Sequence, residues 1–331
     1  MGSLPIPSLG LGCAQLGDLW EEMADETATA IVDAAWDAGI RYFDTAPHYG
    51  VGLSEQRLGR ALSGRPRDNY VVSTKVGRLL EPHVGRETDV RGSKGKTVRR
   101  RWDFSRDGVL RSLDSSLERL GLDRVDIALL HDSGDRLDDA LSTGYAALAE
   151  VRDAGLVGAI GAGDGNVETL VRLVAECELD VILLAGRLTL LDHTAQTELV
   201  PLCRARGVRI IAAGVFNTGV LAAPDPRGAR FEYQAAHESV VARARSLAAF
   251  AQSSGVTLQQ LAIQYPLGFP EVRSVVVGAD SPEQIAESAA SFGATVPDEV
   301  WAAFAELEAG LEAEFDAEAA RNDAGERRGA S

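Results

Sequence analysis

The alternation of short apolar segments with longer amphipathic ones constrains the fold of this 331-residue chain more than any other feature. Several of the short segments are apolar without alternation, which is typical of strands buried on both faces of a parallel sheet. The segments predicted as strands are Leu9–Gly12, Arg41–Phe43, Tyr70–Thr74, Val125–Leu130, Leu156–Gly161, Val181–Leu184, Val208–Ala213 and Val272–Val277. Helical patterns between them include Thr27–Ala38, Gly108–Leu120, Leu137–Ala154, Val167–Cys177 and Glu238–Ser253. Such strand–helix units in a chain of this length predict an α/β fold, a closed (β/α)₈ TIM barrel that forms a single domain over residues 1–331.

Three segments depart from this alternation, and one of them, Gly214–Tyr233, is rich in glycine, proline and asparagine. Residues 77–103 carry many arginines and lysines in an otherwise acidic chain and predict a long loop. This loop either attracts an anionic substrate or cofactor, or is simply a solvated surface segment. Residues from about 315 to 331 predict a frayed tail.

The composition excludes several classes of partner. A net charge of −16 argues against nucleic acid or an anionic membrane as the main partner. No apolar run has the roughly 20 residues that a membrane span needs, and the first residues do not resemble a secretory signal. Cys13, Cys177 and Cys203 are sparse and widely spaced, which favours reduced thiols in a cytoplasmic protein. The five histidines lack the spacing of a zinc site, so we expect chemistry without a metal.

Polar side chains follow three of the predicted strands. Asp44 and Tyr49 come after the strand that ends at Phe43, Lys75 ends the next strand, and His131 ends the one after that. Active sites of (β/α)₈ barrels lie at the carboxyl ends of the strands. We therefore expect these four side chains to lie close together.

An Asp–Tyr–Lys–His cluster suits hydride transfer to a carbonyl, because the oxyanion that forms must receive a proton. A tyrosine supplies that proton if its pKa is lowered, and a nearby lysine ammonium is expected to lower it. An aspartate holds the lysine, and a histidine donates a hydrogen bond to the carbonyl oxygen. Taken singly, Tyr49 is readily a packing residue, His131 a structural hydrogen-bonding residue and Asp44 a loop cap. The four together are the specific signal.

The same residues stand in motifs that resemble the aldo-keto reductases over almost the whole chain. The motifs are Ala38–Gly50, Ser54-Glu55, Val72–Gly77, Ser112–Gly121 and Asp126–His131. The resemblance implies a (β/α)₈ barrel that binds NAD or NADP without a Rossmann domain, with Asp44, Tyr49, Lys75 and His131 as the catalytic residues. In the oxidative direction Tyr49 acts as the base.

Within the family, Leu183–Asp192 and Phe216–Ala222 resemble the bacterial branch of D-threo-aldose (L-fucose or D-galactose type) 1-dehydrogenases and pyridoxal 4-dehydrogenase. This resemblance implies the oxidation of a lactol to a lactone. One alternative is an NADPH-dependent carbonyl reductase, including one that acts in secondary metabolism. A second is a barrel that binds without catalysis, against which the intact set of four residues argues. The particular substrate and the oligomeric state stay open.

The resemblance also implies the cofactor contacts. They are Gly12, Asp44, Asp164, Gly214, Val215, Phe216, Asn217, Gly219, Gly278, Ala279, Asp280, Gln284, Glu287 and Ser288. The loop 214–219 is expected over the pyrophosphate, and 278–284 near the adenosine ribose. Ser281 and Pro282 also fit an ordinary helix cap. A carboxylate at Asp280 would repel a 2′-phosphate, so NAD is slightly favoured over NADP.

Two departures from the family pattern affect the nicotinamide. Gly163-Asp164 replaces a Ser-Asn pair that usually grips its amide, and Leu188 replaces a tyrosine that usually stacks on its ring. We expect Leu188 to pack against the ring face. On the substrate side, Trp20, His48 and Trp102 are expected around the reacting carbon. The two tryptophans equally fit a role in sealing the mouth of the barrel.

Overall fold

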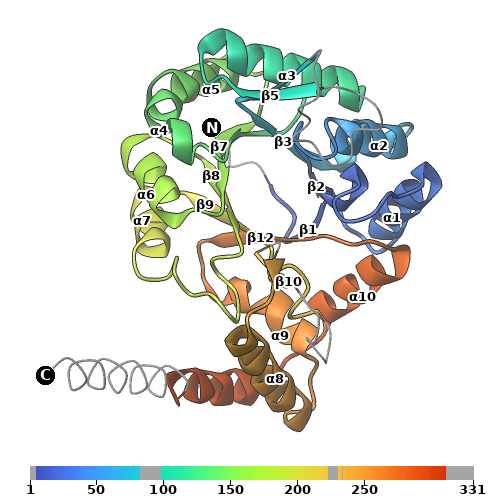
Figure 1. Ribbon diagram of the computed structural model, residues 1–331, viewed down its shortest axis with the longest axis vertical. Helices are drawn as coiled ribbons and strands as arrows, with labels where there is room; N and C mark the ends of the chain where they lie inside the picture. The colour runs from blue at the N-terminus through green and yellow to red at the C-terminus, as the bar shows by residue number, and fades with distance from the viewer. Residues whose placement is uncertain (1–4, 83–97, 223–229, 233, 311–331) are drawn as a thin grey trace, which may run out of the picture.

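The computed structural model describes residues 5–82, 98–222, 230–232 and 234–310. Its centre is a closed barrel of parallel strands, which confirms the predicted (β/α)₈ fold (Figure 1). The strands are β1 (Leu9–Gly12), β2 (Tyr42–Asp44), β3 (Val71–Val76), β6 (Ile127–His131), β7 (Ala159–Asp164), β8 (Val181–Ala185), β9 (Arg209–Ala213) and β12 (Val272–Val277). They neighbour one another in that order, and β12 pairs with β1 to close the ring. The chain forms one domain.

Helices surround these strands in Figure 1. They are α1 (Asp25–Asp37), α2 (Leu53–Leu62), α3 (Arg106–Leu120), α4 (Leu137–Asp139), α5 (Tyr145–Asp153), α6 (Val167–Glu176), α7 (Leu199–Arg206), α8 (Glu238–Ser253), α9 (Leu258–Gln264) and α10 (Pro282–Gly293). Residues 298–310 are also helical. Polar side chains begin several of the helices: Ser105, Asn166 and Thr257 each accept a hydrogen bond from a backbone N–H of the first turn.

Side chains inside the barrel and outside it form separate apolar clusters. Inward-facing residues such as Leu129, Leu183 and Ile211 fill the interior, and Ile6, in the segment that leads into β1, packs with them. Outward-facing residues of the same strands, such as Leu130 and Ile182, pack in a larger cluster with the helices. Because both faces are buried, the strands need no alternation of polar and apolar residues, as the sequence indicated.

Two predicted elements differ from the structure. The strand predicted from Leu156 begins at Ala159, because Gly155 turns the chain with a φ of 73° and leaves Leu156 exposed. The helix predicted over Leu137–Ala154 is divided by a π-helical segment at Ala140–Gly144. There the Thr143 hydroxyl donates a 2.8 Å hydrogen bond to the carbonyl of Phe104.

The segment predicted as a long loop contains two paired strands. β4 (Arg78–Pro82) and β5 (Val98–Trp102) are antiparallel, with Arg78 opposite Trp102. Gly77 turns the chain from β3 into β4 with a φ of 92°, and a Cβ there would lie 2.1 Å from the ring of Phe104. A second short pair joins β10 (Arg230–Phe231) and β11 (Gln234–Ala235). The predicted tail at about 315–331 lies outside the described residues.

The described residues contain no helix that is long and apolar enough to cross a membrane. Cys13, Cys177 and Cys203 are buried free thiols. In the described ranges, no three histidine, cysteine, aspartate or glutamate side chains are grouped so as to hold a metal ion.

Candidate active site

Lys75 is the centre of the strand-end cluster. Its ammonium donates hydrogen bonds to Asp44 Oδ2 at 2.7 Å, to the Thr45 carbonyl at 3.0 Å and to the Tyr49 hydroxyl at 3.0 Å. Burial alone would lower the pKa of Lys75, but the charge of Asp44 and the Tyr49 phenol raise it above its ordinary value. Lys75 is therefore a permanent cation whose three N–H groups are all occupied.

Asp44 is held on its other side by strand residues. Ser73 donates a 2.6 Å hydrogen bond to Asp44 Oδ1, and the Tyr42 hydroxyl lies 2.9 Å from Ser73 Oγ. Both strands place these side chains in register, because Asp44 on β2 pairs with Ser73 on β3. The carboxylate is thus fixed at both oxygens before any ligand binds.

A second buried carboxylate supports the strand that carries Lys75. Glu55, on α2, accepts a 2.7 Å hydrogen bond from the hydroxyl of Thr74 and a 2.6 Å bond from Arg119 Nε on α3. Glu55 is completely buried, so this pair of bonds is what makes its charge tolerable. The network ties β3 to two helices one residue before Lys75.

The Tyr49 hydroxyl accepts a hydrogen bond from Lys75, and the Tyr49 side chain is partly exposed. Burial raises the pKa of Tyr49 to about 12, whereas the charge and hydrogen bond of Lys75 lower it. The expectation that Lys75 brings this pKa below its ordinary value is therefore wrong. Lysine acts in the expected direction, but desolvation of the phenolate outweighs it. At neutral pH Tyr49 holds its proton.

His131 completes the cluster from the end of β6. Its ring lies 6.2 Å from that of Tyr49 and 5.8 Å from that of His48, both edge to face. Burial and the nearby charge of Lys75 hold the pKa of His131 well below its usual range, so the ring is neutral. The pKa of His48 falls to about 3, first through burial and then through the charge of Arg78. Both imidazoles are hydrogen-bonding groups at neutral pH and not cations.

Arg78 and Asp132 also lie at this end of the barrel, and neither was predicted from the sequence as a site residue. Arg78 Nη1 is 3.1 Å from Asp132 Oδ2 and 3.2 Å from His48 Nδ1. Its guanidinium also lies 4.8 Å from the centre of the Trp102 ring. The same oxygen of Asp132 is 3.6 Å from His131 Nε2. Arg78 is the first arginine of the basic segment 77–103, and its place directly after the strand that carries Lys75 is the sequence signal that could have pointed to it.

The three residues predicted around the substrate fall into two groups. His48 and Trp102 both contact Arg78 beside His131. Trp20 instead packs with Arg230, whose guanidinium lies 4.5 Å from the centre of the indole ring. The structure therefore gathers two of the three around one arginine and joins the third to the segment that follows β9.

The loop after β9, predicted to cover the pyrophosphate, has an unusual backbone. Gly214, Asn217, Thr218 and Gly219 all have positive φ, between 46° and 100°. Asn217 is nearly buried, and its Oδ1 has no hydrogen-bond partner among the described residues. Successive residues in such conformations turn N–H groups to one side, which suits an anion. The side chain of Val215 is 1% exposed, so only its main chain is available to a ligand.

The segment predicted near the adenosine caps α10. Ser281 Oγ accepts a 3.3 Å hydrogen bond from the N–H of Gln284, and Gln284 Oε1 accepts one of 2.8 Å from the N–H of Asp280. Pro282 follows the cap, as the ordinary helix-cap interpretation requires. Of the other predicted contacts in this segment, Ala279 and Ser288 are buried, Gly278 is half-buried and Glu287 is exposed.

Leu188 and Asp164, the two residues that depart from the family pattern near the nicotinamide, have different surroundings in the structure. Leu188 is 1% exposed and packs in the core with the helices, so the expectation that it covers the nicotinamide ring is wrong. Asp164 ends β7, and burial raises its pKa to about 6. Its Oδ1 accepts a 2.9 Å hydrogen bond from the N–H of Asn166. Its Oδ2 is buried with no hydrogen-bond partner among the described residues. The predicted contact Gly12 ends β1 and is partly exposed.

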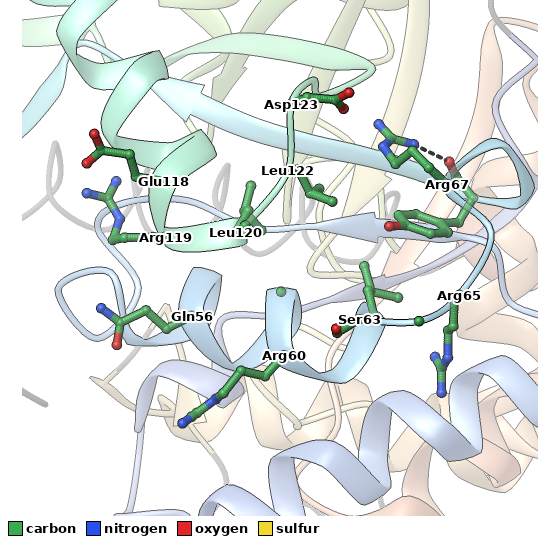
Figure 2. Close-up of a pocket in the computed structure, with 15 residues that line it drawn as sticks. Gln56, Arg60, Ser63, Arg65, Arg67, Glu118, Arg119, Leu120, Leu122 and Asp123 are labelled. Carbon is green, nitrogen blue, oxygen red and sulfur yellow. Dashed lines mark hydrogen bonds between the residues drawn. The ribbon is translucent and has the colours of Figure 1, made fainter.

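A separate groove of about 550 Å³ lies between α2 and the end of α3 (Figure 2). Its lining residues precede β3 and β6, so it opens near the amino ends of those strands and away from Lys75. Of its arginines, Arg60 pairs with Asp25, Arg65 with Asp33, Arg67 with Asp126 and Arg119 with Glu55. The groove is therefore not a candidate for the chemistry of the barrel's carboxyl end.

Comparison with known proteins assigns the class of this barrel. Residues 8–309 match the model of the Aldo/keto reductase family. The chain belongs to this family and is an oxidoreductase.

Two characterised relatives cover most of the chain. A D-threo-aldose 1-dehydrogenase of a Pseudomonas species is 46% identical over 310 residues, which are 92% of this chain and 94% of the relative. A pyridoxal 4-dehydrogenase of Microbacterium luteolum is 39% identical, over 90% of this chain and 93% of the relative. The predicted family and branch resemblance is thereby confirmed.

Solved structures resemble the fold over a similar extent. The holo form of an aldo-keto reductase from Bacillus halodurans is 26% identical with a TM-score of 0.73, covering 92% of this chain and 95% of that chain. An aldo-keto reductase from Klebsiella pneumoniae in complex with NADPH is 22% identical with a TM-score of 0.67. It covers 91% of each chain.

Proposed function

We propose that the protein is an aldose 1-dehydrogenase that oxidises a lactol to a lactone with NAD or NADP. The 46% identity to the D-threo-aldose 1-dehydrogenase over nearly the whole of both chains carries this proposal. The Lys75–Tyr49 hydrogen bond of 3.0 Å at the carboxyl end of the barrel supports it.

Each residue of the cluster has one task in this reaction. In oxidation Tyr49 first releases its own proton to solvent, a loss that the charge of Lys75 favours, and the phenolate then takes the proton of the substrate hydroxyl. Asp44 keeps Lys75 charged and in place. His131 is neutral and donates a hydrogen bond from Nε2 to the reacting oxygen. When bound, the nicotinamide supplies the acceptor for the hydride. In the direction of reduction, Tyr49 returns the proton.

The residues present fit a dinucleotide. The run of positive φ angles in the loop suits an anionic ligand through its N–H groups. The unpartnered Oδ1 of Asn217 suits a ligand group that donates a hydrogen bond, such as a hydroxyl or an amide. At the other end, the pKa of Asp280 is raised by burial and by the charge of Glu21. Two carboxylates there oppose a third negative group such as a 2′-phosphate. NAD is therefore the favoured cofactor in this proposal.

The test is an absorbance assay of the reduced nicotinamide, with NAD and NADP against a panel of aldoses and aldehydes. We expect NAD-linked oxidation of an aldose, and lactone as the product. Tyr49→Phe should lose about 10³-fold in kcat, whereas titration with the cofactor alone should show that binding survives. Unchanged turnover in Tyr49→Phe would overturn the acid/base role.

A second candidate is a carbonyl reductase working in the opposite direction. The cluster is chemically reversible, and an NADH-specific methylglyoxal reductase of Escherichia coli is 28% identical to this chain. Faster aldehyde reduction than aldose oxidation in the same assay would favour this candidate. A barrel without catalysis would give neither signal, and the ordered Lys75–Tyr49 pair argues against it.

A further inference from the structure

Asp132 is the next residue after His131 and has a backbone conformation that few residues other than glycine adopt. Its φ is 42°, and its N–H donates a 2.9 Å hydrogen bond to the carbonyl of Gly163 on the neighbouring strand. A positive φ at a non-glycine residue is a local cost that the surrounding structure must hold in place. Here it brings the Asp132 carboxylate to within 3.6 Å of His131 Nε2.

This carboxylate is anchored by one oxygen and partly open to solvent. Arg78 Nη1 holds Oδ2 at 3.1 Å, and the side chain of Asp132 is 42% exposed. Oδ1 makes no hydrogen bond to any other described residue. Arg78 itself lies over Trp102 and donates to His48, so its position does not depend on Asp132 alone. Asp132 therefore offers a fixed acceptor beside the histidine.

The position of this acceptor relative to the reacting atom is set by His131. The reacting oxygen must lie within hydrogen-bond reach of both Tyr49 and His131. A hydroxyl on the neighbouring substrate carbon then lies close to the reacting oxygen. It reaches Asp132, whose carboxylate lies beside His131 Nε2. A carboxylate accepts from a hydroxyl there but repels a carboxylate or phosphate.

We propose that Asp132, held by Arg78, accepts a hydrogen bond from the substrate hydroxyl on the carbon next to the reacting carbon. The site thereby selects aldoses and 2-hydroxyaldehydes over their 2-deoxy counterparts. This inference rests on the proposed hydride-transfer function and names the part of the substrate that the site recognises.

The experiment measures kcat/KM for two pairs of compounds. One pair is an aldose and its 2-deoxy analogue in oxidation, and the other is 2-hydroxypropanal and propanal in reduction. Each pair is measured with the unaltered protein, with Asp132→Asn and with Asp135→Asn, an exposed aspartate in the same loop. We expect the unaltered protein to prefer the hydroxylated compound by about 10- to 100-fold, since the hydrogen bond is to a charged group. In Asp132→Asn the preference should fall about tenfold, because the acceptor loses its charge. Asp135→Asn should keep the preference.

The two pairs separate failure of this inference from failure of the proposed function. A protein that oxidises no aldose but prefers 2-hydroxypropanal, with the preference lost in Asp132→Asn, refutes aldose oxidation and supports the role of Asp132. A protein that oxidises an aldose and its 2-deoxy analogue equally well overturns the role of Asp132. An equal loss on both members of each pair in Asp132→Asn also overturns it, because a residue that only positions His131 would act on both.

Discussion

Two buried ion pairs of this barrel are similarly buried but differ in the groups that their cations contact. Lys75 and Asp44 have side chains that are 2% and 5% exposed, and those of Arg57 and Asp18 are 4% and 6% exposed. Arg57 donates to Asp18, to Asp25 and to the carbonyls of Leu16 and Met23. All its acceptors are backbone carbonyls or carboxylates, so it can only hold the segment after β1 in place.

Lys75 differs from Arg57 in one acceptor. Two of its N–H groups go to Asp44 and the Thr45 carbonyl, and the third goes to the partly exposed phenol of Tyr49. A buried cation can assist catalysis when one of its hydrogen-bond partners is a group able to exchange a proton with a substrate. Burial and charge pairing alone do not distinguish the two sites.

The largest effect should come from Lys75→Met. We expect kcat to fall about 10³-fold, because Tyr49 loses the charge that favours its phenolate. The free energy of unfolding should also fall, by about 3 kcal/mol, since Asp44 stays buried without its counter-charge. Steady-state kinetics corrected for the folded fraction by circular dichroism measures the first quantity. A kcat within about tenfold of the unaltered value would remove the distinction between the pairs.

Arg57→Met should separate stability from chemistry. We expect the free energy of unfolding in urea to fall by about 3 to 5 kcal/mol, because Asp18 loses its buried partner. The kcat of the folded molecules should stay within about tenfold of the unaltered value, since Arg57 touches no group of the cluster. Arg60→Met is the matched control: Arg60 also pairs with Asp25 but is 59% exposed. Its removal should cost less than about 1 kcal/mol. An equal loss in both variants would contradict the role given to Arg57.

Asp164 extends the comparison because it is a buried carboxylate that forms no ion pair with any cation among the described residues. Burial raises its pKa to about 6 from an ordinary 3.8, so the folded state disfavours its charge. The cost is absent at pH values below the ordinary pKa, develops as the pH rises from the ordinary pKa to the raised one, and is complete above the raised pKa. Asp164→Asn should therefore raise the free energy of unfolding by about 2 kcal/mol at about pH 8. The gain should disappear by about pH 4. Thermal unfolding across this pH range measures it, and a gain that does not depend on pH would refute the explanation.

The smallest effect is expected at Asp280, a surface residue whose carboxylate is only partly buried. Asp280→Asn should lower the KM for NADP about threefold relative to that for NAD, through loss of repulsion from a 2′-phosphate. The change should shrink in high salt, because exposed charges are screened. Initial rates with both cofactors at two salt concentrations test this. A preference of the unaltered protein for NADP would contradict the role of Asp280.

The sequence predicted the barrel well because apolar strands buried on both faces leave a continuous signal. Asp44, Lys75 and His131 were predictable as neighbours, since each ends such a strand and the carboxyl ends of parallel strands meet. The π-helical segment at Ala140–Gly144 left no pattern that could be distinguished from a plain helix.

Other features depend on three-dimensional surroundings that no local pattern encodes. The pKa of Tyr49 was predicted in the wrong direction because the degree of burial of a loop residue cannot be read from its neighbours. Asp132 was overlooked because its side-chain direction follows from a positive φ that the local sequence does not predict. Leu188 was assigned to the ring face by alignment with a family position, but its side chain packs in the core.

The β4–β5 hairpin has a consequence for how barrels of this kind diversify. Arg78 and Trp102 face each other at its base, one residue from Gly77 and Asp103, whose backbones are joined by a 2.9 Å hydrogen bond. The base is thus fastened to the barrel independently of what the hairpin carries further out. Insertions and deletions beyond the base can accumulate during evolution while the arginine that contacts Asp132 and His48 keeps its place.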